Sequence, residues 1–287
     1  MGSSLKIVEQ FKQEMENMFE MNDLGLMKYF LGFEIKQDVY GIHLSQKKYA
    51  EELLKIYKMR GCKALSIPIS ASTKQQLFEQ SEEANATYYR CLIGKLLYLT
   101  HSRPDLMPVV SLLSRFMACP TKIQFAAARN VLRYVAGTLD FGIQYYRSSK
   151  FVLEGFSDSD WCGDLRDRKS TSGFVFNLGS GAVCWASKKQ DVVALSSTET
   201  EYIALCGACC HGVWMKKILT DFGIQVEDAF PILCDNKFCI LIAKNPALHG
   251  RSKHIDVKFH YIRELVNNKL MELKLSVVIL LMYQCDY

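Results

Sequence analysis

The sequence predicts an α/β (α+β) chain, with a mixed sheet and flanking helices in its second half and an α-rich first half. The 287 residues are 49% hydrophobic and 23% charged, which is a globular composition. Apolar residues follow a helical period through much of the first half, and the pattern then changes to the alternation typical of strands. Strands followed by helices are the element order of an α/β layer fold.

The first half begins with an amphipathic helix, which we expect over residues 5–20. A hairpin then joins strands at 26–35 and 42–44 around a turn at 38–41. Ser45 is expected to cap the next helix. The apolar face of that helix carries Tyr49, Leu53, Leu54 and Tyr57.

Residues 71–86 are rich in Ser, Thr, Gln and Glu, which predicts a surface connector. Three helices are expected after it, at residues 87–101, 105–117 and 121–136. Pro104 and Pro120 separate these helices because a proline prevents a helix from continuing through it. Gly137 is expected to end the last one.

The second half predicts a mixed, mostly antiparallel sheet. Its first strands are expected at 151–157, 173–178 and 182–187, with a tight turn at 179–181. Thr198 and Glu201 have the spacing of a capping box at the start of a long helix, which should end near Gly223. A fourth strand at 231–234, a short helix and a further helix at about 252–267 complete the pattern.

Three carboxylates are predicted to meet at one edge of this sheet. Asp158 and Asp235 each end a strand, and Glu201 lies in the first turn of the long helix. Open α/β sheets bind ligands at that edge. Clustered carboxylates repel one another unless cations join them, so we expect two Mg²⁺ (or Mn²⁺) ions, which would clamp the attacking and leaving oxygens of a phosphodiester. The alternative for each acid is a helix cap or a solvated edge.

Basic side chains in nearby loops are candidates for contacts with phosphates, and an ordinary solvated surface is the alternative. They are Arg166, Arg168, Lys169, Lys188, Lys189 and Lys253. Trp161 and Trp185 are candidates for stacking on a sugar or base, although a strand Trp is more often in a core. His254 and Asp256 form either a first-turn cap and packing pair or a contact with nucleic acid or metal.

The eleven cysteines have no framework spacing and occur in apolar segments, which indicates buried thiols in a reducing compartment. Examples are Cys91, Cys184, Cys206 and Cys239. Cys206 and Cys209 have a metal-ligand spacing, but they lie on a predicted helix without a second ligand cluster, and Cys210 separates Cys209 from His211, which excludes the haem motif. Buried core thiols are therefore expected there.

No signal peptide is evident, and the apolar run at 276–283 is too short to span a bilayer. We therefore expect a soluble, intracellular protein without a membrane partner. The formal charge of +5 is mild and only slightly favours a polyanionic partner.

The acidic blocks GFSDSDWCGDLRDRKSTSGFVF, SSTETEYIALC and ILCDNKFCILIA resemble the RNase H domain of copia-type (Ty1/copia) retrotransposon Pol polyproteins, in order and in spacing. Upstream, DLGLMKYFLGFEI, LSQKKYAEELLKIYKM, YRCLIGKLLYLTHSRPDL and AARNVLRYVAGT resemble the end of the reverse transcriptase and its bridge to RNase H. The resemblance covers residues from about 8 to 273.

The resemblance implies an RNase H-like fold after a thumb and connection remnant. The implied domains are the end of the reverse transcriptase palm and thumb at 1–70, a helical connection at 71–149, an RNase H-like domain at 150–275 and a divergent tail at 276–287. The family's first three metal-binding, catalytic acids fall on Asp158, Glu201 and Asp235. Asp160 is a second candidate for the first position, and Asp256 is another candidate ligand.

The implied activity is metal-dependent endonucleolytic hydrolysis of the RNA strand in an RNA–DNA hybrid. Two departures bear on it. The family's Tyr-Val-Asp-Asp block is not found in this chain, so no polymerase activity is expected, and LKLSVVILLMYQCDY replaces the family's helix resembling QLADIFTK, whose Asp is the fourth acid. The alternative is a catalytically inactive retroelement relic that folds and binds nucleic acid weakly.

Overall fold

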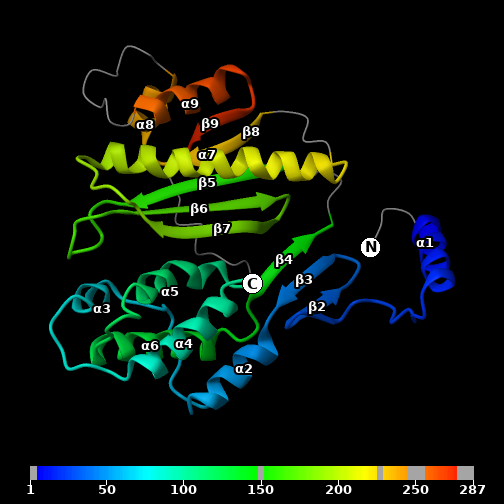
Figure 1. Cartoon of the computed structure of the whole chain (residues 1–287), viewed down its shortest axis with the longest axis horizontal. Helices are drawn as coiled ribbons and strands as arrows, with labels where there is room; N and C mark the ends of the chain where they lie inside the picture. Colours follow the sequence, from blue (N-terminus) through cyan, green and yellow to red (C-terminus); the bar gives the residue numbers. More distant parts are fainter. Residues whose placement is uncertain (1–4, 148–151, 225–228, 245–255, 277–287) are drawn as a thin grey trace.

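The computed structural model describes residues 5–147, 152–224, 229–244 and 256–276, which form two sheets and two hydrophobic cores (Figure 1). The predicted fold class is confirmed: an α-rich first part precedes a mixed α/β sheet with flanking helices. In the part of the chain that the structure describes, no helix combines the length and apolar character that crossing a bilayer requires.

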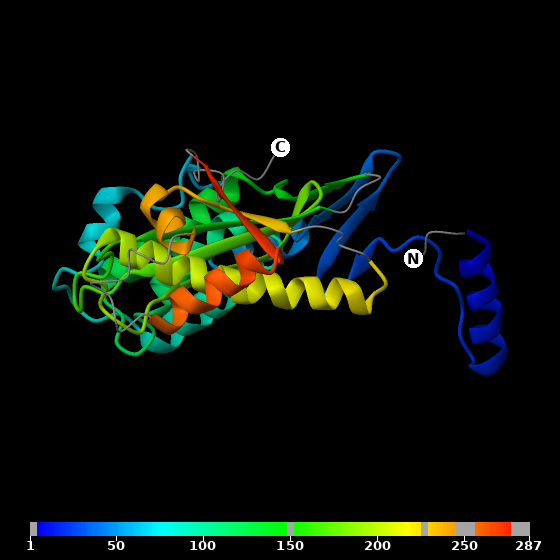
Figure 2. The same ribbon diagram turned by 90° about the horizontal axis from the view of Figure 1, so that it is seen from above.

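The first part combines a small sheet with a helical bundle. The strands are β1 (Tyr29–Phe30), β2 (Phe33–Gln37), β3 (Gly41–Ser45) and β4 (Gly142–Tyr146), antiparallel in that order. The helices are α1 (Leu5–Met18), α2 (Lys47–Ile56), α3 (Ala71–Gln76), α4 (Ala86–Leu99), η1 (Pro104–Leu106), α5 (Met107–Ser114) and α6 (Lys122–Gly137). Figures 1 and 2 show α1 set apart from the rest, and its apolar Phe11 and Met18 are exposed.

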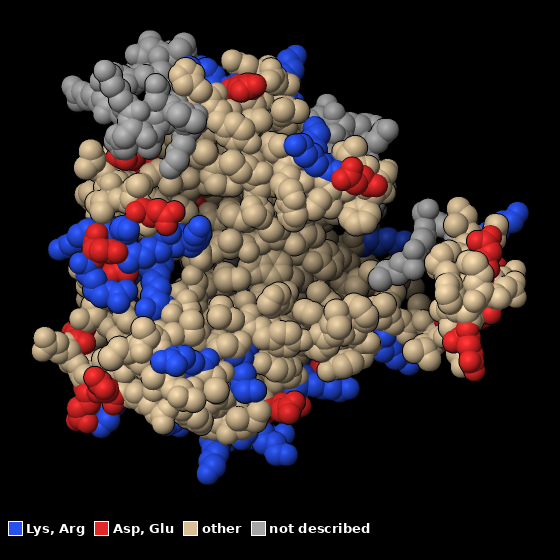
Figure 3. Space-filling view, in the orientation of Figure 1, with Lys and Arg blue, Asp and Glu red and all other residues tan. Residues whose placement is uncertain are grey.

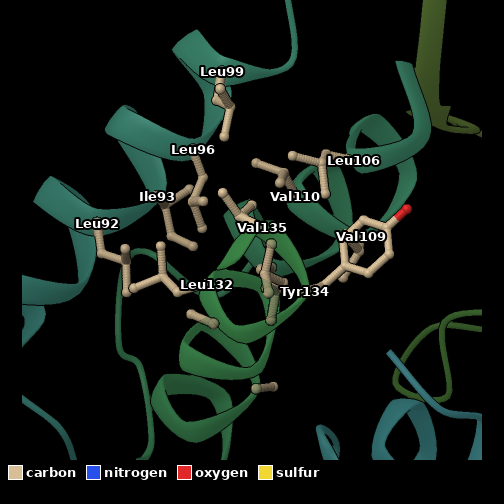
Figure 4. Packing of buried hydrophobic residues seen from close by; sticks show 14 of the residues in the cluster. Leu92, Ile93, Leu96, Leu99, Leu106, Val109, Val110, Leu132, Tyr134 and Val135 are labelled. Atoms are coloured by element: carbon tan, nitrogen blue, oxygen red, sulfur yellow. The ribbon is translucent and has the colours of Figure 1, made fainter. Parts of the chain in front are cut away.

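The helical bundle encloses the first core because α4, α5 and α6 each direct an apolar face inward (Figure 4). Leu96 of α4, Val110 of α5 and Leu132 of α6 are fully buried in it. Fully burying an aliphatic side chain contributes about 1.5–3 kcal/mol. The second sheet packs against this bundle.

The second part is built on a five-stranded sheet in the order β7-β6-β5-β8-β9. Its strands are β5 (Leu153–Asp160), β6 (Thr171–Leu178), β7 (Gly181–Lys189), β8 (Phe230–Cys234) and β9 (Met271–Leu275). The helices are α7 (Ser197–Asp221), α8 (Lys237–Lys244) and α9 (Asp256–Asn267). The second core lies between the sheet and these helices, with Phe176, Leu205 and Ile232 fully buried.

Polar contacts join the two parts between the bundle and the sheet. The Ser111 hydroxyl donates to the carbonyl of Ser187 at 2.7 Å, and Trp185 Nε1 donates to the carbonyl of Thr100 at 3.0 Å. Arg115 Nη2 donates to the Thr171 hydroxyl at 2.9 Å. A cavity of about 370 Å³, which we call the α5 cavity, remains between α5 and the sheet.

Several local predictions are wrong. Residues 71–76 form α3 rather than a connector, because Ser70 accepts a hydrogen bond from Thr73 N and caps the helix. The N-cap of α2 is Gln46 and not Ser45. The sheet is mixed as predicted: the β5–β6 and β6–β7 pairs are antiparallel, and the β5–β8 and β8–β9 pairs are parallel. The short strand β4 was not expected at all.

Candidate functional site

The long helix α7 begins two residues before the predicted capping box. Ser196, not Thr198, is the N-cap, and its hydroxyl accepts a hydrogen bond from Glu199 N at 3.2 Å. The Glu199 carboxylate in turn accepts from Leu195 N at 2.9 Å. Glu201 therefore lies in the second turn and not the first, and its side chain is not used in capping.

Glu201 and Asp235 come together at the predicted edge of the sheet. A carboxylate oxygen from each of them and the sulfur of Cys234 all lie within 4.8 Å of one another. The Ser159 hydroxyl donates to Glu201 Oε1 at 2.8 Å and holds that side chain toward β5. The site therefore combines three elements, which are β5, α7 and the end of β8.

Asp158 lies beside this group without joining it. Ser157 pairs with Cys234 in the parallel β5–β8 ladder, and strand alternation turns Asp158 to the other face, where it lines the α5 cavity. Burial, and then the negative charge of Asp235, raise the pKa of Asp158 to about 6. The structure thus brings the three predicted acids into one neighbourhood but places ligand atoms of only two of them in the close group.

Glu201 is 7% exposed, and its Oε2 atom has no hydrogen-bond partner among the described residues. Burial raises the pKa of Glu201 to about 8 in spite of the hydrogen bond from Ser159. A buried carboxylate oxygen without a partner is costly unless a cation or a proton compensates its charge. The donor set therefore fits a divalent cation.

Asp160 is tied to other groups. Its carboxylate accepts a hydrogen bond from Thr171 N and pairs with Lys74 Nζ of α3 at 3.3 Å. These contacts favour a structural role that joins β5, β6 and α3. The side chain of Asp256, with Lys253 and His254, lies outside the described residues.

The predicted basic residues divide into two groups. Arg166 and Lys189 bind the buried carboxylate of Asp164 at 3.1 and 2.5 Å, and Arg166 also stacks on Phe116. Arg168 and Lys188 are exposed, and Lys169 is half-buried. Figure 3 shows Lys and Arg gathered at the end of the molecule where β5 joins β6. The edge of the sheet where Glu201 and Asp235 meet, which we call the acidic edge, lies at the same end of β5.

Sequence analysis missed Cys234, Ser159 and Asp164. Cys234 directly precedes Asp235, but a sulfur in a strand gives no sign of which side chains it will meet on α7. Ser159 is visible only as alternation with Asp158 and Asp160. Asp164 is fully buried in a loop, where the charge pattern predicts a surface.

The cysteine prediction is confirmed in part. Cys209 and Cys239 are buried, whereas Cys184 and Cys206 are half-buried. Cys91 and Cys210 are exposed, because each falls on the outer face of its helix. Trp185 lies at the junction of the two parts, and Trp161 is 58% exposed next to the acidic edge.

Comparison with known proteins gives consistent matches. Residues 1–71 match a family described as reverse transcriptase (RNA-dependent DNA polymerase). The chain is 36% identical, over 93% of its length, to the retrovirus-related Pol polyprotein from transposon RE2 of Arabidopsis thaliana, of which it spans 18%. It is 37% identical, over 74% of its length, to an uncharacterized mitochondrial protein of Arabidopsis thaliana, of which it covers 88%.

Among solved structures, the chain is similar to a ribonuclease H1, LC11-RNase H1, in complex with an RNA/DNA hybrid. The match has a TM-score of 0.30 and 11% identity, and it covers 43% of this chain and 83% of that one. This likeness concerns the fold and carries no functional inference.

Proposed function

This chain belongs to the copia-type retrotransposon Pol polyprotein family, and on that premise we propose that its second part hydrolyses the RNA strand of RNA–DNA hybrids with the help of divalent cations. The chain spans about a fifth of the Pol polyproteins that it matches. We assign residues 150–275 to this activity, 1–70 to the end of the palm and thumb, 71–149 to the connection and 276–287 to a divergent tail.

The observation that supports this proposal most strongly is the close group of Glu201 and Asp235, with the buried Oε2 of Glu201 lacking a partner among the described residues. Asp158, Glu201 and Asp235 would hold two Mg²⁺ or Mn²⁺ ions. The bound cations would supply the positive charge that activates water and stabilises the leaving oxygen of a phosphodiester. Ser159 keeps Glu201 turned toward β5, so that Glu201 and Asp158 approach from opposite faces of one strand.

The exposed cations beside the acidic edge supply the contacts for the hybrid. Arg168 and Lys188 are exposed there and would contact phosphates on either side of the cut. The side chain of Arg166 is 48% exposed and is held by Asp164 and Phe116, so it presents a preorganised charge. The 2′-hydroxyl is the group by which such a site distinguishes RNA from DNA.

Cleavage of a labelled RNA–DNA hybrid tests the proposal. The purified chain is incubated with hybrid in Mg²⁺ or Mn²⁺, and EDTA and an Asp235→Asn variant serve as controls. We expect cleavage of the RNA strand that requires the cation and that Asp235→Asn abolishes. Duplex DNA of the same sequence should stay intact.

If the hybrid binds but stays intact in both Mg²⁺ and Mn²⁺, the nuclease proposal is rejected. The alternative, a catalytically inactive retroelement relic that binds nucleic acid, is then favoured. The separation of Asp158 from the close group of Glu201 and Asp235 is the feature that favours this second candidate. Mg²⁺ titration by calorimetry separates the two functions further. Asp158→Asn, Glu201→Gln and Asp235→Asn should each weaken Mg²⁺ binding if the site is assembled as proposed.

A further inference from the structure

The sulfur of Cys234 changes the kind of cation that the acidic edge can bind. Cys234 is fully buried at the end of β8, and its sulfur lies within 4.8 Å of a carboxylate oxygen of Glu201 and one of Asp235. Mg²⁺ takes oxygen ligands and gains nothing from a sulfur, whereas Zn²⁺ and Cd²⁺ bind thiolates strongly. One sulfur and two carboxylates with a fourth position left for water is a suitable ligand set for Zn²⁺.

Two buried polar atoms without partners adjoin this group. Glu201 Oε2 has no hydrogen-bond partner among the described residues, and Glu201 is only 7% exposed. Ser157 Oγ also has none among them, and Ser157 is the fully buried neighbour of Cys234 in the β5–β8 ladder. Both atoms therefore mark the α7 side of the strand ends as a place where a ligand would satisfy polar groups.

The chain directly after Cys234 is held in place by the start of α8. Asp235 and Asn236 separate Cys234 from α8, and Cys239, which is fully buried, lies in the first turn of that helix. Asn236 Oδ1 accepts from Cys239 N at 3.0 Å and fixes this turn. Hydrogen bonds from outer groups orient a metal ligand and tune its affinity.

We propose that Glu201, Cys234 and Asp235 form a binding site for a thiophilic divalent cation, Zn²⁺ or Cd²⁺, which competes with Mg²⁺ for the acidic edge. The position of Cys234 places a bound cation on the α7 side of β5 and away from Asp158, which faces the α5 cavity. A bound Zn²⁺ or Cd²⁺ would then hold the carboxylates of Glu201 and Asp235 in an arrangement to which Asp158 contributes no ligand. This inference concerns the same acids as the proposed function but does not require that the chain cut a hybrid.

Cadmium titration of the reduced, metal-free chain tests the inference through the ultraviolet charge-transfer absorption of a Cd²⁺–thiolate bond. The parent should develop the band with one equivalent of Cd²⁺, and Zn²⁺ should compete the band away. Cys234→Ser should remove the band or weaken Cd²⁺ binding about tenfold or more. Millimolar Mg²⁺ should displace Zn²⁺ readily from Cys234→Ser and poorly from the parent.

Matched variants keep the test decisive in a chain with eleven cysteines. Cys184→Ser, in β7, should leave the band unchanged, and so should Cys206→Ser, which tests the CxxC spacing on α7. Glu201→Gln and Asp235→Asn keep the thiol and should weaken Cd²⁺ binding, so the test does not depend on folding of Cys234→Ser. A band that survives in Cys234→Ser and disappears in Cys206→Ser would overturn the inference. Hybrid cleavage in Mg²⁺ without a Cd²⁺ band would reject this site alone, and a band without cleavage would reject the nuclease alone.

Discussion

At the scale of single residues, burial decides how the acids behave. Glu201 is held where water solvates its charge poorly, and its pKa is raised to about 8. Asp164 is equally enclosed, but hydrogen bonds from Arg166 and Lys189 outweigh burial and keep its pKa well below the usual range. The surroundings of Glu201 thus disfavour its charged form, whereas those of Asp164 favour it. The first kind is typical of functional sites and the second of structural ones.

Glu201→Gln should change how stability depends on pH. The folded pKa of about 8 exceeds the ordinary 4.5, so the stabilising contribution of Glu201 is complete below 4.5 and is lost as the pH rises through 8. The glutamine variant lacks this loss, and its advantage should grow to roughly 2–4 kcal/mol at about pH 9. Thermal unfolding of the metal-free chain between about pH 5 and about pH 9 measures this. Glu154→Gln, at the far end of β5, is the control, and an equal advantage in that variant would contradict the prediction.

Asp164→Asn should destabilise the loop between β5 and β6. The carboxylate is fully buried, and it pairs with Arg115, Arg166 and Lys189. Removing one partner from a buried ion cluster leaves uncompensated charge and costs about 3 kcal/mol. Asp167→Asn is the control because Asp167 is exposed, and its carboxylate pairs with Lys189 and accepts a hydrogen bond from Lys169 N. Chemical denaturation of both variants makes the comparison, and equal losses would show that burial of Asp164 contributes nothing.

At the scale of elements, the start of α7 positions the site. Ser196 and Glu199 satisfy backbone N–H groups at this end, so Glu201 lies free of capping in the next turn. The parallel register of β5 with β8 places Ser157 beside Cys234 and therefore Asp158 beside Asp235. Helix start and strand register together set which acids meet.

Ser196→Ala should cost about 1 kcal/mol of stability through loss of the cap, whereas Thr198→Ala should cost much less. The hydroxyl of Ser196 accepts from Glu199 N, whereas Thr198 lies inside α7. Urea denaturation of the two variants distinguishes them. A larger loss in Thr198→Ala would mean that the helix begins where the sequence pattern first indicated.

The sequence predicts the elements better than their ends or their pairings. Helical periodicity correctly indicates α4, α6 and α7, since each has a continuous apolar face. The strand β4 was missed because GIQYY follows α6 after a short turn, and its partner β3 lies far away in the sequence. The parallel pairs of β8 were missed for the same reason, because pairing between distant segments leaves no local pattern.

The same limit applies to the site. Asp158, Glu201 and Asp235 could be named because motif spacing and strand ends point to one edge. The separation of these acids into a close pair, Glu201 and Asp235, and a neighbour on the other face, Asp158, could not be predicted. It depends on the direction of the side chains at the strand ends. The role of Asp164 required knowledge of Arg115, which comes from the other part of the molecule.

At the scale of the whole molecule, polar contacts between the bundle and the second sheet join the two parts. Ser111, Arg115 and Trp185 contribute hydrogen bonds across this junction, and the α5 cavity lies between them. Such contacts hold the acidic edge at a fixed position relative to the bundle.

Trp185→Phe should weaken the coupling between the two parts while leaving both cores intact. The variant keeps an aromatic ring but leaves the carbonyl of Thr100 without its donor, which costs about 1 kcal/mol. Hydrogen exchange should then show β7 and the end of α4 opening more readily than α6. Trp161→Phe, at an exposed position, is the control. Uniform protection in both variants would show that the junction does not depend on this bond.

The pairing of β3 with β4 also sets the order in which the chain can assemble. Gly41 lies opposite Tyr146, so about a hundred residues separate the partners in this ladder. During synthesis, β3 is an unprotected edge until the whole helical bundle and β4 have left the ribosome, and such edges favour pairing with other chains. The bundle between them folds through local contacts and shortens the distance that the two strands must close. A nascent chain stopped before residue 142 should therefore self-associate, whereas one that includes β4 should not.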